Sequence, residues 1–185
     1  MRLVVTKDDY FAAALDVLAT DGHAALKIGS LCATIGVTTG SFYHYFGGWD
    51  GFVRELLAHW EQEKTQRIFE IAAAETDPLA RVRKIKKLAL TLPHEAETAI
   101  RAWSHINPIV DEVQRRVDRE RLDAVRSVIA GVVPDRRQAE VLAVMGVSLL
   151  VGLQQWRSPV DERELARLLE AYEDLILTHV AAAAS

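Results

Sequence analysis

The side chains best able to form intermolecular hydrogen bonds gather in one short stretch near the N-terminus. Six lie within eight residues: Thr38, Thr39, Ser41, Tyr43, His44 and Tyr45. Hydroxyl and imidazole groups of this kind bind phosphate oxygens and the edges of nucleic-acid bases. Phe42 and Phe46 interrupt them at i, i+4, the spacing of one helix face. The pattern predicts a short helix with an apolar anchor and an outward polar face, a form that a DNA major groove accepts.

The segment before this stretch is predicted to position it. Four apolar residues recur at i, i+3, i+4 and i+7 and predict a first short helix: Ile28, Leu31, Cys32 and Ile35. Gly36 is expected to end that helix in a left-handed conformation, after which Thr38 caps the start of the next. Two short helices joined by a tight turn have the format of a helix-turn-helix.

These residues resemble the DNA-binding domain of the tetracycline-repressor (TetR) family of transcriptional regulators, over roughly residues 6 to 60. The shared features are the Gly36-Val37 turn, Gly40, the aromatic run ending at Phe46, and a preceding helix that ends at Gly22. The resemblance implies an all-helical homodimer whose three N-terminal helices bind an operator, with an effector pocket and a dimer interface in the remaining helices. The predicted DNA-binding residues are Lys27, Thr38, Thr39, Gly40, Ser41, Tyr43, His44, Tyr45 and Gly48.

The charge of the N-terminal region is unusual for a DNA-binding protein. The formal net charge of the chain is −4, and residues 1 to 50 contain only Arg2, Lys7 and Lys27 as cations, against five aspartates. Binding to DNA normally depends on Lys and Arg neutralising phosphates. The family pattern also has a phosphate-contacting lysine where this chain has Trp49, so a Trp49→Lys variant is predicted to bind DNA more strongly unless Trp49 is a packing residue.

Helical patterns continue through the whole chain, so the predicted fold class is all-α. The predicted division is a helix-turn-helix domain over residues 1–48, a linking helix over about 49–74, and a helical effector-binding and dimerisation domain over 75–185. Asp77 and Pro78 fit the cap and first position of a new helix. Asn107-Pro108 predicts a further boundary, between a short helix and a long one that runs to Gly131.

The last two predicted helices indicate self-association. Residues 141–153 are apolar on every face, which predicts burial on all sides. The final helix carries a second apolar stripe, and two such helices from each of two subunits would form a four-helix bundle. The alternative is a core formed within one chain.

An effector pocket is predicted from large or polar-tipped side chains in the middle of the chain, because apolar pockets contain a few orienting polar groups. The candidates are Trp60, Phe69, Trp103, His105, Asn107, Met145 and Trp156. Five of them form the predicted site: Trp60, Trp103, His105, Met145 and Trp156. Core packing is the alternative for each aromatic residue, and an ordinary hydrogen-bonded side chain is the alternative for His105.

No spacing of residues indicates an enzyme, a metal site or a cofactor. His94-Glu95 begins like a zinc-protease motif, but Thr98 stands where the second histidine is required. The single cysteine, Cys32, excludes an intrachain disulfide; a packing role is expected, with a thiol sensor as the alternative. The basic run 81–87 is expected to be a solvated helix face, with contact to DNA or an anionic ligand as the alternative.

Composition is that of an ordinary globular protein, with half of the residues hydrophobic and 26% charged. The predicted location is the cytoplasm, without a signal peptide, a membrane span or a membrane partner. The predicted function is that of a sequence-specific DNA-binding regulator, a repressor released by a small-molecule effector. The competing hypothesis is a helical small-molecule-binding protein or enzyme that has lost operator binding, which the sparse basic residues favour.

Overall fold

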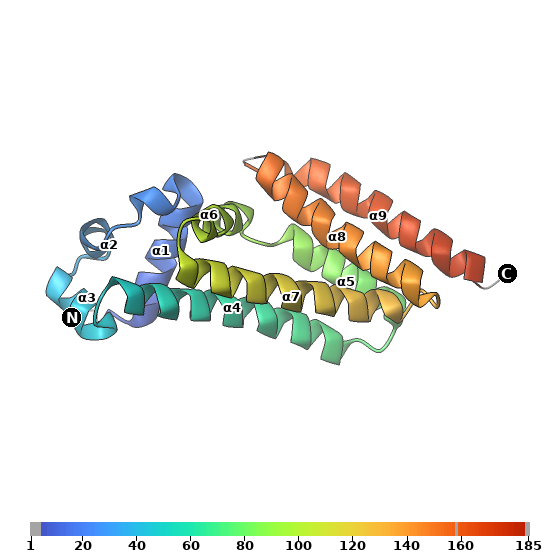
Figure 1. The fold of residues 1–185 in the computed structure, drawn as a ribbon, viewed down its shortest axis with the longest axis horizontal. Coiled ribbons are helices and arrows are strands. Elements are labelled where there is room, and N and C mark those ends of the chain that lie inside the picture. Colours follow the sequence, from blue (N-terminus) through green and yellow to red (C-terminus); the bar gives the residue numbers. More distant parts are fainter. Residues whose placement is uncertain (1–4, 158, 184–185) are drawn as a thin grey trace. The chain divides into compact units, whose positions relative to one another are not determined.

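The structure is a computed structural model that describes residues 5–157 and 159–183; for residues 63–74, 182 and 183 it describes the backbone only. The described residues form nine α-helices and one short 3-10 helix, with no strand, which confirms the all-α fold class (Figure 1). The elements are α1 Lys7–Asp21, η1 His23–Ala25, α2 Ile28–Ile35, α3 Thr39–Phe46, α4 Trp49–Ala74, α5 Pro78–Leu90, α6 His94–Ser104, α7 Pro108–Ala130, α8 Arg136–Trp156 and α9 Glu162–Ala183.

Local capping explains where several helices begin. The Asp9 carboxylate accepts a hydrogen bond of 2.7 Å from the backbone N–H of Thr6, and this bond lowers the pKa of Asp9. Asp77 is the N-cap of α5, which begins at Pro78. Its carboxylate accepts hydrogen bonds from the backbone N–H groups of Leu79 and Ala80. Both caps satisfy backbone donors that a helix start leaves without partners. The predicted helix boundary at Asp77-Pro78 is confirmed.

The helices group into two compact units. Unit 1 contains Met1–Glu63 and Pro93–Arg115, and unit 2 contains Lys64–Leu92 and Arg116–Ser185. The predicted DNA-binding domain lies inside unit 1, which also includes α6 and the first residues of α7. Because the sequence analysis assigned α6 to the C-terminal domain, the compact units differ from the predicted division, and the functional division stays a prediction.

In unit 1, helix α1 packs against α2 and α6, and α2 packs against α3. A cluster of aromatic rings on α1, α3 and α4 forms its centre: Tyr10, Phe11, Phe42, Phe46 and Phe52. Neighbouring ring centroids in this cluster lie 5.1 to 5.9 Å apart for the pairs Tyr10–Phe42, Phe42–Phe46 and Phe46–Phe52. Such aromatic pairs favour edge-to-face geometry and add to the stability that burial provides.

In unit 2, helices α8 and α9 lie side by side, and α5 packs against α9 (Figure 1). One apolar cluster joins α5, α7, α8 and α9 around Val82, Ile129, Leu142 and Ile176. A second cluster joins α8 and α9 around Leu150, Leu153, Leu165 and Leu169. These clusters provide an apolar core within the chain for the C-terminal helices.

Helix α8 is long and apolar enough to cross a membrane, as judged by its length and composition alone. The core helix of a soluble protein passes the same test. Only 33% of the most apolar stretch of α8 is buried within the described chain. The predicted burial on all sides is therefore not reached within one chain.

Candidate nucleic-acid interface

The turn between α2 and α3 has the geometry that its sequence predicts. Gly36 has a φ of 73°, in the left-handed region that favours glycine. The backbone N–H of Val37 donates to the carbonyl of Cys32 at 2.9 Å, which closes the turn. Thr38 caps α3, because its hydroxyl oxygen accepts a bond of 3.3 Å from the N–H of Ser41. These local bonds set the direction in which α3 leaves the turn.

The inner face of α3 anchors it to unit 1. Phe42 is fully buried and Phe46 nearly so, in contact with Tyr10 of α1 and Phe52 of α4. The rings fix the rotation of α3 about its own axis, because both lie on one face of the helix. The opposite face of α3 is thereby held toward solvent.

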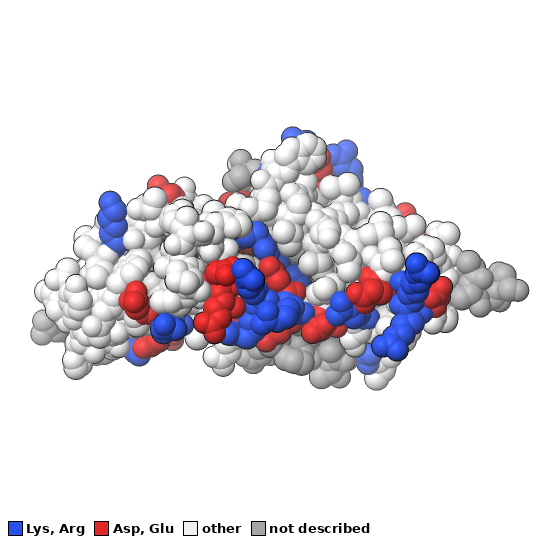
Figure 2. All heavy atoms as spheres, in the orientation of Figure 1, with Lys and Arg blue, Asp and Glu red and all other residues white. Residues whose placement is uncertain are grey.

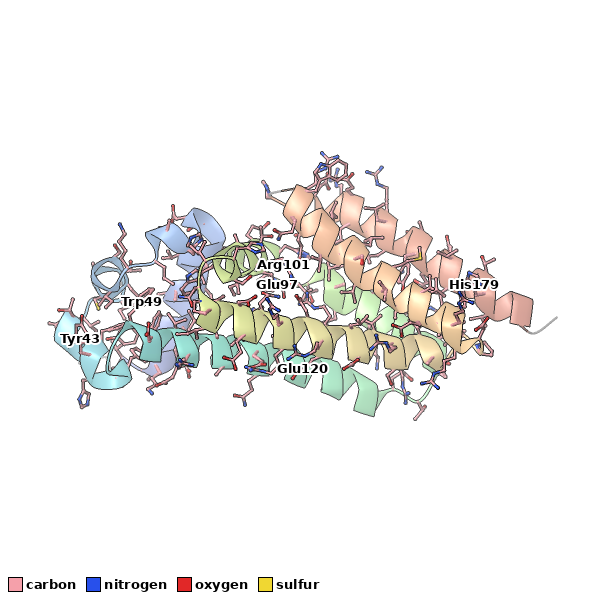
Figure 3. All side chains as sticks on the ribbon, in the orientation of Figure 1. Tyr43, Trp49, Glu97, Arg101, Glu120 and His179 are labelled. Atoms are coloured by element: carbon pink, nitrogen blue, oxygen red, sulfur yellow. The ribbon has the colours of Figure 1, made fainter. Side chains whose placement is uncertain are left out.

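The structure places most of the predicted DNA-binding residues on the surface. Exposed are Lys27, Thr38, Thr39, Gly40, Tyr43 and His44; partly buried are Ser41, Tyr45 and Gly48. Tyr43 is 53% exposed, and no hydrogen bond from its hydroxyl is found among the described residues (Figure 3). The residues from Thr38 to Tyr45 therefore lie on α3 and at its N-cap, whereas Lys27 lies at the N-cap of α2 and Gly48 lies between α3 and α4.

Two hydroxyls of the predicted set have partners within unit 1. Tyr45 donates from its hydroxyl to the carbonyl of Val5 at 2.7 Å, which ties the start of the chain to α3. The hydroxyl of Tyr10 lies 3.2 Å from Ser41 Oγ and donates to it. Burial raises the pKa of Tyr10 and keeps it a protonated donor. Sequence periodicity does not identify such partners, because they lie 40 and 31 residues away.

The candidate interface contains very little positive charge. Residues 28–46 include no Lys, Arg, Asp or Glu, and Figure 2 shows a largely uncharged surface around α2 and α3 on the face drawn. Lys7 is paired with Glu55 at 2.5 Å, and its ammonium also lies 5.4 Å from the centre of the Phe46 ring. Among the described residues of this region, Lys27, Arg54, neutral donors and helix N-termini are available for contacts to phosphates.

Trp49 and Gly51 connect α4 to the helix-turn-helix. The Trp49 ring lies 5.6 Å from Phe52 and 6.4 Å from Trp103, between ring centroids (Figure 3). These contacts favour the packing alternative for Trp49. A Cβ atom on Gly51 would lie 2.1 Å from the carbonyl oxygen of Phe46, so only glycine permits this approach of α4 to the end of α3. Gly51 is not among the residues predicted from sequence, although a glycine inside a helical pattern was a signal for a close backbone approach.

The predicted effector residues are divided between the two compact units. Trp60 and Trp103 are buried in unit 1, where Trp103 stacks on His23 and packs against Trp49. His105 is exposed. Met145 and Trp156 belong to unit 2 and are 44% and 76% exposed. The side chain of Phe69 lies outside the described residues, and Asn107 caps α7 by accepting bonds from the N–H groups of Ile109 and Val110.

A cavity of about 110 Å³ lies within unit 2 instead, between α5, α7, α8 and α9. Most of its lining is aliphatic, including Ile85, Ala89, Val125 and Leu150. None of the five predicted pocket residues lines it, and the predicted effector site stays a prediction. The walls of the cavity come mainly from valine, isoleucine and leucine on four helices, whereas the sequence prediction selected aromatic and polar side chains.

The structure also bears on the alternatives stated above for Cys32 and for the basic run 81–87. Cys32 is buried, and burial raises the pKa of its thiol, which disfavours the reactive thiolate that a sensor requires. In the basic run on α5, Lys84 pairs with Glu75, and both Arg83 and Lys86 pair with Glu173. These acidic partners favour a solvated, internally neutralised helix face.

Comparisons with known proteins agree with this geometry. Residues 11–56 match the family model described as bacterial regulatory proteins, tetR family. No curated protein is significantly similar to the chain in sequence. Among solved structures, a TetR-family transcriptional regulator from Streptomyces coelicolor is similar with a TM-score of 0.80 and 14% identity, over 94% of this chain and 95% of that one.

Two other solved structures have the same fold over nearly their whole length. A transcriptional regulator from Rhodococcus is similar with a TM-score of 0.77 and 19% identity, over 94% of this chain and 97% of that one. A regulator from Saccharomonospora viridis, solved in complex with choline, has a TM-score of 0.73 and 15% identity, over 91% of this chain and 95% of that one.

Proposed function

We propose that the protein is a cytoplasmic, operator-binding repressor of the TetR family that a small molecule releases from DNA. Two findings support this proposal: residues 11–56 match the model of that family, and nearly the whole chain is similar in fold to solved transcriptional regulators. In this proposal the working form is a homodimer, each subunit inserts α3 into a major groove, and an effector bound in unit 2 lowers the affinity for the operator.

The main support for the proposal is the way in which α3 is fixed to the rest of unit 1. Its buried Phe42 and Phe46 hold the helix in one rotation, while Thr39, Tyr43 and His44 remain exposed on the other side. A recognition helix needs this combination, because base-edge contacts require side chains held in a defined register against the groove.

The low charge of the helix-turn-helix supports a particular mode of binding. With no cation between residues 28 and 46, the contacts to phosphates come from hydroxyls, backbone N–H groups and the few cations nearby. Lys27 and Arg54 are the exposed cations in the described part of residues 5–60. Four such cations in a dimer would produce a salt dependence with a slope of only about 4, at about 0.9 per contact.

A homodimer through α8 and α9 is supported by apolar side chains that these helices leave exposed. They are Val141, Val144 and Met145 on α8 and Leu168 and Leu175 on α9. A two-fold dimer reads two half-sites whose centres lie about 34 to 36 Å apart, or a multiple of that distance.

Effector release requires a coupling free energy of about 1 to 3 kcal/mol between the two sites, and the coupling is reciprocal. The cavity within unit 2 supports a ligand site in this chain. The choline complex of the regulator from Saccharomonospora viridis is a precedent for a small molecule bound to a protein of this fold.

The competing function, a small-molecule-binding protein without operator binding, is favoured by a single observation: the absence of charged residues in the helix-turn-helix. It predicts that the purified protein binds its ligand and shows no sequence preference on DNA.

Selection of bound sequences from a random duplex library, followed by titrations at several salt concentrations, tests the proposal. We expect an inverted-repeat site and a slope of log K against log salt of about −4. Lys27→Ala should reduce the magnitude of the slope by about 1.8, since a dimer loses two contacts. Lys87→Ala, which removes an exposed cation of α5, is the matched control and should leave the slope unchanged. The absence of any enriched sequence would refute operator binding.

A further inference from the structure

The cavity within unit 2 also indicates which chemical class of ligand it accepts. We propose that it binds a neutral, apolar molecule about the size of a single aromatic ring, and that it discriminates against organic cations and carboxylates. The regulatory consequence of this binding depends on the function proposed above, but the binding preference itself does not.

The walls of the cavity are the first argument. They consist mainly of aliphatic side chains from four helices, such as Val82, Leu88, Val128 and Leu169. A pocket of this composition gains free energy by removing apolar ligand surface from water, at about 25 cal/mol per Å². It offers no such gain to a charged molecule, which has to give up its hydration on entry.

The charged side chains that line the cavity already have partners within the chain, which is the second reason to expect a neutral ligand. Lys86 donates to the Glu173 carboxylate, and Arg83 donates to the same carboxylate at 3.2 Å. Hydrogen bonding from Lys86 lowers the pKa of Glu173, so this carboxyl remains ionised and paired. Glu120 and Arg121, the other charged residues on the lining, also interact within the chain. A charged ligand therefore finds no unpaired counter-ion.

The hydroxyl of Tyr172 is engaged as well. It donates to the backbone carbonyl of Leu142 on α8, and the ring lies directly over Gly146. A Cβ atom on Gly146 would lie 2.7 Å from the Tyr172 hydroxyl oxygen, so glycine allows the ring to lie against α8. With its proton committed to Leu142, Tyr172 presents mainly its ring to the cavity.

The size of the cavity limits the ligand. Its volume is about 110 Å³, whereas pockets for drug-sized ligands measure about 300 to 1,000 Å³. An apolar cavity of about 150 Å³ stays dry and takes up benzene. The cavity in unit 2 is thus suited to a molecule of roughly this size. Because the cavity is partly open to solvent, a larger ligand would leave part of its surface outside the apolar walls.

Direct binding measurements on the full-length protein without DNA test the inference. Toluene, benzoate and choline serve as neutral, anionic and cationic probes in calorimetric titrations. We expect toluene to bind at least tenfold more tightly than either charged probe. Equal or tighter binding of benzoate or choline, or no binding of toluene, would overturn the proposal.

Three variants test where the ligand binds and why charged ligands bind weakly. Ala124→Leu adds volume on the cavity wall and should weaken toluene binding at least tenfold, whereas Ala130→Leu, on an exposed position of the same helix, should not change it. Glu173→Gln leaves Lys86 and Arg83 without their carboxylate and should strengthen benzoate binding several-fold. If Ala124→Leu has no effect while its melting temperature stays normal, toluene binds elsewhere and the proposal fails.

The same probes test the proposed ligand class independently of the proposed regulatory role. Toluene that binds the cavity but does not change operator affinity would support the inference about ligand class and contradict effector release by this class of molecule. Operator binding without any toluene binding would leave the DNA-binding function intact and overturn the inference.

Discussion

The two tyrosines of α3 differ in what their hydroxyls contact. Tyr43 is exposed, and its hydroxyl has no hydrogen-bond partner among the described residues, while the Tyr45 hydroxyl donates to the carbonyl of Val5. One side chain is therefore available to DNA, and the other holds the N-terminal segment against the domain. The sequence analysis placed both in the predicted DNA-binding set.

Tyr43→Phe is expected to weaken operator binding by about 1 to 2 kcal/mol, the range for a hydrogen bond to a charged phosphate. Tyr45→Phe removes the same atom two residues away and should instead lower the free energy of unfolding by about 0.5 to 1.5 kcal/mol. Fluorescence anisotropy with operator DNA and chemical denaturation measure the two effects. Equal losses of operator affinity in both variants would contradict the distinction.

Gly51→Ala is expected to destabilise the protein by about 1 to 3 kcal/mol, the usual cost of overpacking. Alanine has the better helix propensity by about 1 kcal/mol, but its Cβ would meet the backbone carbonyl of Phe46, which cannot move without shifting α3. Gly29→Ala in α2 is the matched control, because nothing lies within 4 Å of the added atom there. Thermal unfolding should show a lower midpoint for Gly51→Ala and an unchanged or higher one for Gly29→Ala.

Among the helices of unit 2, α9 is held to its neighbours by polar contacts as well as by its apolar stripe. Tyr172 donates to the carbonyl of Leu142 on α8, and Glu173 accepts from Arg83 and Lys86 on α5. Because adjacent residues of one helix point in different directions, α9 contacts both neighbours at the same level. These two residues also border the cavity, which links the packing of α9 to ligand binding.

The Tyr172 contact predicts a pH dependence of stability. Burial raises the pKa of Tyr172 from 10.0 to about 12 in the folded protein. The neutral hydroxyl is therefore the form that folding favours, and its contribution is fully present below pH 10 and is lost as the pH rises toward 12. Tyr172→Phe should be less stable at pH 7 by about 0.5 to 1.5 kcal/mol, since it loses one hydrogen bond.

The difference in unfolding free energy between wild type and Tyr172→Phe should shrink as the pH rises from 10 to 12. Denaturant titrations of both proteins across this range measure it, and the subtraction removes the other groups that titrate there. A difference that stays constant from pH 7 to pH 12 would show that the hydroxyl is not protected from ionisation.

For the molecule as a whole, α8 has an apolar surface that the described chain leaves largely uncovered. This helix is apolar along most of its length, but only 33% of its most apolar stretch is buried within the described chain. Exposed apolar residues on α8 and α9 provide a surface for a second copy of the chain, as the proposed dimer requires.

Val144→Glu is expected to raise the dissociation constant of the dimer at least tenfold, because an unpaired carboxylate in an apolar interface loses its hydration. Operator affinity should fall with it, since one subunit reads only one half-site. Ile106→Glu is the matched control, because Ile106 is 70% exposed in unit 1. Sedimentation velocity measures the assembly, and a Val144→Glu protein that remains as dimeric as Ile106→Glu would exclude α8 from the interface.

Several features of this protein were predictable from sequence because they depend on residues close together in the chain. The left-handed Gly36, the Thr38 cap, and the Asp77-Pro78 start of α5 are local, and each is confirmed. Helical periodicity likewise identified Phe42 and Phe46 as the buried face of α3. Such predictions succeed because capping and periodicity involve at most a few neighbouring residues.

Other features depend on which distant segments meet, and only the folded chain determines them. The bond from Tyr45 to Val5, the packing of Trp49 on Trp103, and the inclusion of α6 in unit 1 each join residues 40 or more positions apart. The cavity is the clearest case. Its walls are mostly ordinary aliphatic residues with no sequence signature, and they line a partly open cavity only because four helices pack around it.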